Sequence, residues 1–179
     1  MQVSILPLRL FGDPVLRERA EPVTTFDKEL HQLVDDLKET MLASGGAGLA
    51  APQLGVSLRV FALHPDLSEE KLDHLINPVL AFPDEVDQDG REGCLSAPGI
   101  YLDTKRRMNV VAKGLSKHGD PVQIVGNGLL ARCIQHETDH LDGILFVDRR
   151  DTLRQDGLLA AIMAADWYNE RLTVKVSPH

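Results

Sequence analysis

One stretch, residues 129–141, decides the fold: it reads LLARCIQHETDHL and lies between Gly128 and Gly143. Leu129, Cys133 and the two histidines share one face of a helix with 3.6 residues per turn, and a second apolar face carries Leu130, Ile134 and Leu141. A glycine before the stretch and another after it suit the two ends of a helix. We therefore expect a central helix that is buried on two sides.

This helix contains an H-E-x-x-H motif, HETDH, at residues 136–140. Residues four apart lie one above the other on a helix, so His136 and His140 can reach one metal ion. Glu137 is offset around the helix but close enough to touch a water on that ion. The alternative, a solvent-facing helix rich in histidine and acids, conflicts with the two apolar faces. The motif therefore predicts a metal site.

A catalytic metal site needs a third protein ligand and an open position for water. After the helix the chain offers Asp142 and Asp148, but no histidine before His179. Before it, Cys94 lies in the segment EGCLS, residues 92–96, and a thiolate binds iron or zinc well. From the residues alone, Cys94 is either the third ligand or an inert buried thiol.

Two further helices are expected. The first begins near Thr24 or Thr25, either of which could be its N-cap, and ends at Gly45 and Gly46. One apolar stripe supports it, formed by Phe26, Leu30, Leu33, Val34, Leu37 and Met41. The other helix spans about Leu153 to Glu170.

Short strands are expected between the helices. The best candidates are residues 59–63, 110–112 and 122–125, with turn signals at Asn77-Pro78, Asp89-Gly90 and Gly119-Asp120. There is no βαβ alternation, which indicates an α+β fold. We expect short, mainly antiparallel strands packed around the central metal-binding helix, with an N-terminal and a C-terminal helix.

The whole chain fits one domain, residues 1–179. Its formal charge is 19 − 27 = −8, so direct binding to nucleic acid or an anionic membrane is not expected. Two cysteines are too few for a disulfide framework. The first residues do not have the pattern of a signal peptide, and no apolar run approaches the length of a membrane span. These features together predict a cytoplasmic protein.

Three segments together resemble peptide deformylases: GAGLAAPQ at residues 46–53, EGCLS at 92–96 and HETDH at 136–140. The resemblance extends from GDPVL, residues 12–16, to LFVD, residues 145–148. It covers roughly residues 5–150 and weakens over 151–179, where a variable C-terminal helix and tail are expected. Linked in this order and spacing, the three motifs are highly specific.

The resemblance implies a hydrolase that removes the N-formyl group from N-formylmethionine of nascent polypeptides and releases formate. It implies that Cys94 is the third ligand of one divalent metal ion per chain. Iron(II) is the usual metal of the family, and zinc, nickel or cobalt can occupy such a site. Metal-bound hydroxide would attack the formyl carbon, with Glu137 as general base and then acid. The Gln53 amide and the Leu95 backbone N–H would stabilise the charge on the formyl oxygen.

Substrate binding is expected around the first motif. Gly46, Ala47 and Gly48 can present bare backbone to an extended peptide, which would add as an extra strand. Leu129 and Cys133 are expected to line an apolar pocket for the methionine side chain, so Cys133 would be pocket wall and not a ligand. Arg132 is expected at the rim of this pocket.

Other expectations concern residues around the ligands and the substrate. Asp139 resembles a family position that pairs with an arginine, for which Arg106 is the candidate, and Glu92 is expected to join them. Ala47 stands where the family more often carries a larger aliphatic residue. Tyr101 lies where some members have a basic residue, so both positions bear on peptide preference. Residues 151–179 are not cationic, so any transient ribosome contact should not use a basic C-terminal helix.

Two other functions compete with this one. A metallopeptidase that cuts internal amide bonds would need a further ligand after the helix, and no histidine follows there before the C-terminus. An inactive metal-binding or peptide-binding module would be expected to lack Glu137 or Gln53, and both are present.

Overall fold

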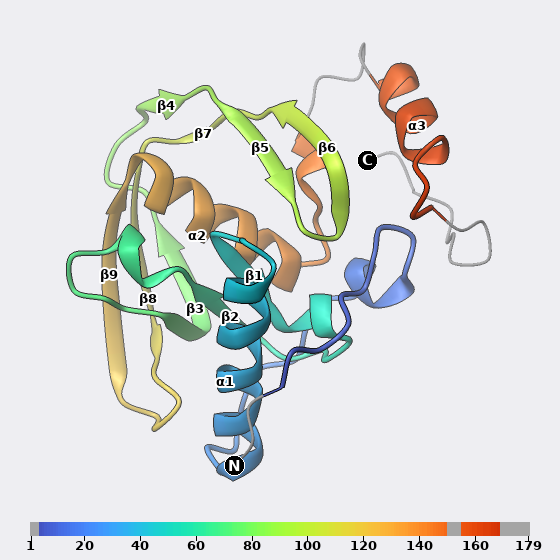
Figure 1. Cartoon of the computed structure of the whole chain (residues 1–179). Helices are drawn as coiled ribbons and strands as arrows, with labels where there is room; N and C mark the ends of the chain where they lie inside the picture. The colour runs from blue at the N-terminus through green and yellow to red at the C-terminus, as the bar shows by residue number, and fades with distance from the viewer. Residues whose placement is uncertain (1–3, 150–154, 169–179) are drawn as a thin grey trace.

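The computed structural model describes residues 4–149 and 155–168 (Figure 1). Its largest sheet has five antiparallel strands in the order β1-β2-β3-β8-β9. They are β1 (Gly48–Ala50), β2 (Val60–Leu63), β3 (His74–Ala81), β8 (Asn109–Leu115) and β9 (Pro121–Asn127). The three strands expected from the sequence are confirmed as β2, β8 and β9, and the α+β class is confirmed as well.

The central helix, α2 (Gly128–Leu141), starts one residue before the predicted range and ends where expected. Every residue from Leu130 to Leu141 is buried, as the two apolar faces indicated. The helix packs against β1, β2, β8 and β9 of the large sheet and crosses the middle of the molecule in Figure 1.

The N-terminal helix, α1, spans Lys28–Ala43 and covers the other face of β1 and β2. Its N-cap is Asp27, whose carboxylate accepts a hydrogen bond from the Leu30 backbone N–H. The expected cap at Thr24 or Thr25 is therefore wrong, because the acidic side chain nearer the first turn takes this role. Gly45 has φ of +69° just after the helix end, in agreement with the expected stop.

The sheet separates two apolar layers because successive side chains of a strand point to opposite faces. On β2, Phe61 and Leu63 pack in the cluster that contains α2, whereas Val60 and Ala62 pack in the cluster that contains α1. A third cluster joins the segment around Leu16 to the part of the chain after α2. Within the described residues, no helix has the length and apolar character required to cross a membrane.

Two small two-stranded sheets lie beside α2 and were not predicted. β4 (Asp87–Gln88) pairs with β7 (Arg106–Arg107), and β5 (Arg91–Cys94) pairs with β6 (Ala97–Asp103). Short 3-10 helices complete the chain: η1 (Pro14–Arg17), η2 (Ala51–Leu54), η3 (Pro65–Leu67) and η4 (Phe146–Arg149).

Two boundaries differ from expectation. Asn77-Pro78 is an irregularity inside β3 and not a turn between strands: Asn77 has φ of +51°, and the register with β8 shifts between Ile76 and Val79. The Asn77 side-chain amide exchanges two hydrogen bonds with the Val23 main chain, which holds this conformation. The C-terminal helix α3 covers only Gln155–Met163, and the ends of the expected range fall outside the described residues.

Candidate metal centre

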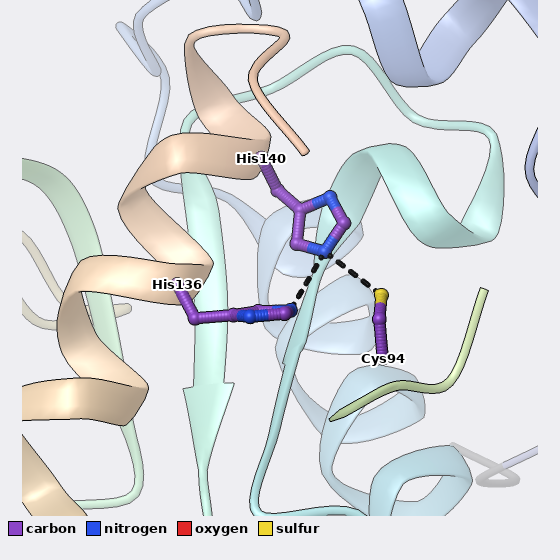
Figure 2. A group of neighbouring side chains, drawn as sticks. All are labelled: Cys94, His136 and His140. Carbon is purple, nitrogen blue, oxygen red and sulfur yellow. Dashed lines mark hydrogen bonds between the residues drawn. The ribbon is translucent and has the colours of Figure 1, made fainter. Parts of the chain in front are cut away.

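Three ligand atoms from two elements meet at one point in the structure (Figure 2). His136 and His140 project from the same face of α2, and Cys94 ends β5. The Nε2 atom of His140 lies 3.2 Å from Nε2 of His136 and 3.3 Å from Sγ of Cys94. All the ligand atoms lie within 4.8 Å of one another.

This arrangement fits a divalent metal ion. Nδ1 of His136 lies 2.5 Å from a Glu92 carboxylate oxygen, so this nitrogen carries the proton and Nε2 presents a lone pair. A tetrahedral ion with ordinary Zn–N and Zn–S bonds would separate its ligand atoms by about 3.4–3.6 Å, close to the two observed distances. One thiolate and two imidazoles suit iron or zinc, and three protein ligands leave a fourth position open.

Glu137 lies beside these three residues but is not one of them. Its side chain is buried, and Oε2 has no hydrogen-bond partner among the described residues. Burial raises the pKa of the Glu137 carboxyl to about 7. A carboxyl with a pKa near neutrality can both take up and release a proton under working conditions.

Glycine at position 48 makes room for Glu137. A Cβ atom there would lie 2.6 Å from Oε1 of Glu137 and 2.8 Å from Sγ of Cys133. The carboxyl group therefore packs directly against the bare backbone of β1. This glycine has a local steric role in addition to the substrate contact expected from the sequence.

Gln53 is buried in η2 and held at both ends of its amide. Its Oε1 accepts a hydrogen bond from the Ala50 backbone N–H at 2.9 Å, and its Nε2 donates to Ser96 Oγ at 3.0 Å. Nε2 also lies 3.6 Å from Cys94 Sγ. Ser96 was not identified from the sequence, although it belongs to the EGCLS segment that carries Cys94.

A cavity of about 490 Å³ opens onto these groups. Its lining includes all eight residues expected to bind substrate or act on it: Gly46, Ala47, Gly48, Gln53, Leu95, Leu129, Cys133 and Glu137. Leu129 is 60% exposed, so it forms an outer wall, whereas Cys133 is buried deeper. Burial raises the pKa of the Cys133 thiol, which keeps it neutral and apolar in character.

Behind the histidines lies a network of paired charges, all buried except Arg149 at its end. Glu92 accepts hydrogen bonds from Arg106 Nη2 at 2.6 Å and from Arg132 Nη1 at 2.9 Å, in addition to that from His136. Burial alone would raise the pKa of Glu92, but the hydrogen bonds from His136 and Arg106 hold it well below its usual range. Asp139 accepts from Arg106 Nη1 at 2.6 Å and from Arg149 Nη2 at 2.6 Å.

Sequence reasoning grouped Glu92, Arg106 and Asp139, and the structure brings them together. It did not identify Arg149 as part of this group. It also expected Arg132 at the pocket rim, whereas this side chain is buried and also donates to the Thr104 carbonyl at 2.7 Å. The one indication in the sequence that Arg132 is buried was its position among apolar residues of the helix.

Comparison with known proteins gives a consistent result. The family described as polypeptide deformylase matches residues 5–156. Peptide deformylase of Parafrankia sp. is 56% identical over 178 residues, 99% of this chain and 96% of that protein. The crystal structure of a peptide deformylase from Legionella pneumophila superimposes with a TM-score of 0.81 at 39% identity, covering 89% of this chain and 94% of that one. The enzyme from Ehrlichia chaffeensis in complex with actinonin gives 0.84 at 31% identity, covering 93% and 100%.

Proposed function

Because the chain belongs to the polypeptide deformylase family, whose members remove N-formyl groups from nascent peptides, we propose that it does so with one metal ion held by Cys94, His136 and His140. The observation that carries this proposal is the meeting of the three ligand atoms beside the buried Glu137 carboxyl, at the base of one cavity. Its proposed substrates are the N-formylmethionyl ends of nascent polypeptides, so we propose that it acts in the cytoplasm.

Membership of the family implies iron(II) as the metal in the cell, with zinc, nickel or cobalt as substitutes, and one thiolate with two imidazoles is compatible with these ions. When bound, the ion would supply Lewis acidity, which lowers the pKa of a water and polarises a carbonyl oxygen. Metal analysis of protein purified without oxygen tests the identity of the ion, and predominance of zinc in such protein would contradict the assignment.

Glu137 moves the protons of the reaction. Its carboxylate takes a proton from the water that attacks the formyl carbon and passes it to the departing amine nitrogen, so that one residue is base and then acid. The position of Glu137 next to the ligands and inside the cavity supports this role. Its burial supports it as well, because the carboxyl group lies away from bulk water.

Gln53 and Leu95 supply the donors for the formyl oxygen. The Gln53 amide is oriented by the Ala50 backbone N–H and by Ser96, so its Nε2 is fixed near Cys94 before substrate arrives. The Leu95 backbone N–H follows the ligand Cys94 directly in the chain. Pre-oriented donors of this kind stabilise developing negative charge, each commonly by about 3 kcal/mol.

The peptide binds along β1. This strand is the last of the large sheet on its side and pairs with β2 within the described residues. No strand among the described residues covers its other edge, where Gln53 takes the Ala50 N–H, so an extended chain can be added beside Gly48. The cavity beside it carries Leu129 and Cys133, which would receive the methionine side chain. Ala47 lines the same cavity with a short side chain. The cavity is therefore wider at this position than it would be with a larger aliphatic residue.

The test is a formate-release assay with protein purified without oxygen and loaded with nickel. We expect formate from formyl-Met-Ala-Ser and no cleavage of the unformylated peptide Met-Ala-Ser. Cleavage of internal bonds in unformylated peptides would instead support a metallopeptidase. Tight peptide binding without any turnover would support an inactive binding module.

A further inference from the structure

Arg91 and Tyr101 form a cationic aromatic pair at the wall of the same cavity. The guanidinium carbon of Arg91 lies 5.0 Å from the centroid of the Tyr101 ring, which is 57% exposed. The two side chains come from neighbouring strands, β5 and β6. An exposed arginine is flexible, and stacking on an aromatic face restricts it to one region of the surface.

The position of the ring is fixed by a glycine next to the metal ligand. Gly93 is the direct partner of Tyr101 in the β5–β6 ladder. A Cβ atom on Gly93 would lie 2.7 Å from Cε1 of Tyr101, so the ring packs on bare backbone one residue before Cys94. The pair is therefore placed at a set distance from the reacting centre.

The charge of Arg91 is not neutralised by an ion pair within the described part of the chain. Asp103 lies opposite Arg91 in the ladder, yet the guanidinium is placed over Tyr101. By contrast, Arg132 in the same cavity wall is buried and paired with Glu92. Arg91 is thus an exposed cation in the wall of this cavity, on a chain of net charge −8.

We propose that Arg91, positioned by Tyr101, is a specificity residue that favours substrates with an acidic second or third residue. This inference rests on the proposed deformylase function. Arg91 lies three strand residues from Cys94, about 10 Å, and an extended peptide starting at the metal covers that distance by its third residue. One guanidinium face stacks on the ring while its N–H edge stays available to a carboxylate.

The experiment compares kcat/KM for four peptides: formyl-Met-Glu-Ser, formyl-Met-Lys-Ser, formyl-Met-Ala-Glu and formyl-Met-Ala-Lys. We expect the wild-type protein to favour glutamate over lysine by about two- to fivefold at one of these positions at low salt. The ratio should approach one in high salt, because an exposed pair is screened.

Matched variants assign the ratio to this pair. Arg91→Gln should bring the glutamate-to-lysine ratio to about one, and Arg91→Lys should retain most of it. Tyr101→Ala should reduce the ratio because the guanidinium loses its platform. Arg19→Gln removes an exposed arginine that is outside this cavity and should leave the ratio unchanged.

The outcomes separate the two proposals. Formate release from all four peptides without a charge preference, or a preference that survives in Arg91→Gln, overturns the inference and leaves the deformylase function standing. A preference for lysine also overturns it. If the wild-type protein released formate from none of the peptides, the proposed function itself would fail.

Discussion

At the scale of single residues, the close contact between Gly48 and Glu137 would link the proposed substrate binding to the proposed proton transfer. The strand that would bind the peptide is also the strand against which the Glu137 carboxyl packs. The position of Glu137 therefore depends on a residue that carries no functional group. Two substitutions test the Glu137 carboxyl: one removes its ability to accept a proton, and the other shifts its position.

The first is Glu137→Gln, which keeps the shape of the side chain but cannot accept a proton. General acid–base groups contribute 10²–10⁴-fold, and here one residue handles both transfers, so we expect kcat to fall about 10³-fold or more. Metal content should remain near one ion per chain by elemental analysis. In Cys94→Ala and His140→Ala the metal should be lost. A Glu137→Gln protein without metal, or with more than about a tenth of wild-type kcat, would remove Glu137 from its proposed role.

The second is Gly48→Ala. The added methyl would lie 2.6 Å from Glu137 Oε1, so the carboxyl must move, and we expect a drop of at least about tenfold in kcat with metal retained. Gly157→Ala is the control, because a Cβ there meets nothing within 4 Å. Unchanged kcat in Gly48→Ala would show that the Glu137 carboxyl does not need the observed position.

Much of the candidate site could be predicted at this scale from local motifs. His136, Glu137 and His140 lie within five residues of one helix, and the EGCLS segment draws attention to Cys94. Arg149 and Ser96 could not be found in the same way, since their roles come from contacts across the fold. Ser96 is buried and Arg149 is exposed, and neither a serine nor an arginine has a local pattern that shows which buried group it contacts.

At the scale of elements, α2 carries an ionic network through the interior. Glu92 on β5, Arg106 on β7 and two residues of α2, Arg132 and Asp139, are all buried, and each charge has a partner. This network attaches both small sheets to the helix that holds the histidines. It therefore fixes the distance between Cys94 and the α2 ligands.

Removal of one member should be costly. Arg106→Ala leaves Glu92 and Asp139 short of a counter-charge in the interior, and we expect a loss of about 3–5 kcal/mol in the free energy of unfolding. Lys105→Ala is the comparison: it breaks an exposed pair with Asp87 and should leave the free energy of unfolding nearly unchanged. Urea denaturation of both variants measures the contrast. Similar small losses in the two would mean that the buried network contributes no more than a surface pair.

Predictions of elements succeeded where periodicity was long and failed where single contacts decided. The apolar stripes of α1 and α2 run over several turns, so both helices were expected. The N-cap depended on one hydrogen bond of Asp27, and the bulge in β3 depends on the contact of Asn77 with Val23. β5 is short, and β6 is as long as β8 and β9 but mostly exposed, so neither has an alternating apolar pattern that predicts a strand.

At the scale of the whole molecule, a second set of charges joins distant parts of the chain. Asp73, just before β3, accepts a hydrogen bond from His74 at 2.7 Å and pairs with Lys38 of α1 at 2.5 Å. The backbone N–H of Lys117, in the β8–β9 turn, donates to His74 at 2.9 Å. The hydrogen bond from His74 and the pair with Lys38 hold the pKa of Asp73 well below its usual range, against the opposing effect of burial.

This shift predicts a pH-dependent contribution to stability. The folded-state pKa of Asp73 is depressed, so its stabilisation is complete above the unfolded pKa of about 4 and is lost as the pH falls through the lower folded pKa. We expect Asp73→Asn to lower the free energy of unfolding by about 1 kcal/mol at pH 7 and pH 5, and by less at pH 3. Denaturation curves at the three pH values measure this. A difference that grows on acidification would contradict the assignment.

The strand order of the large sheet lay beyond the reach of the sequence. Composition and the lack of βαβ alternation indicated α+β, but nothing local shows that β3 pairs with β8 while β4 to β7 form separate ladders. The β3–β8 pairing joins residues that are 30 to 39 positions apart, from Ala81 with Val111 (111 − 81 = 30) to Ile76 with Leu115 (115 − 76 = 39). The strand order depends on packing: one apolar face of the sheet must cover α1 while the other covers α2.

The free edge of β1 also bears on self-association. An unpaired edge strand is a template on which other chains can stack and aggregate. Here the edge is only three residues long, all of them buried, and it opens into a cavity. The edge of another folded sheet is expected to be too wide for such a recess, whereas the end of a newly made chain is narrow enough to enter it. We therefore expect the same geometry to admit unfolded chain ends and to hinder edge-to-edge aggregation with other copies of the protein.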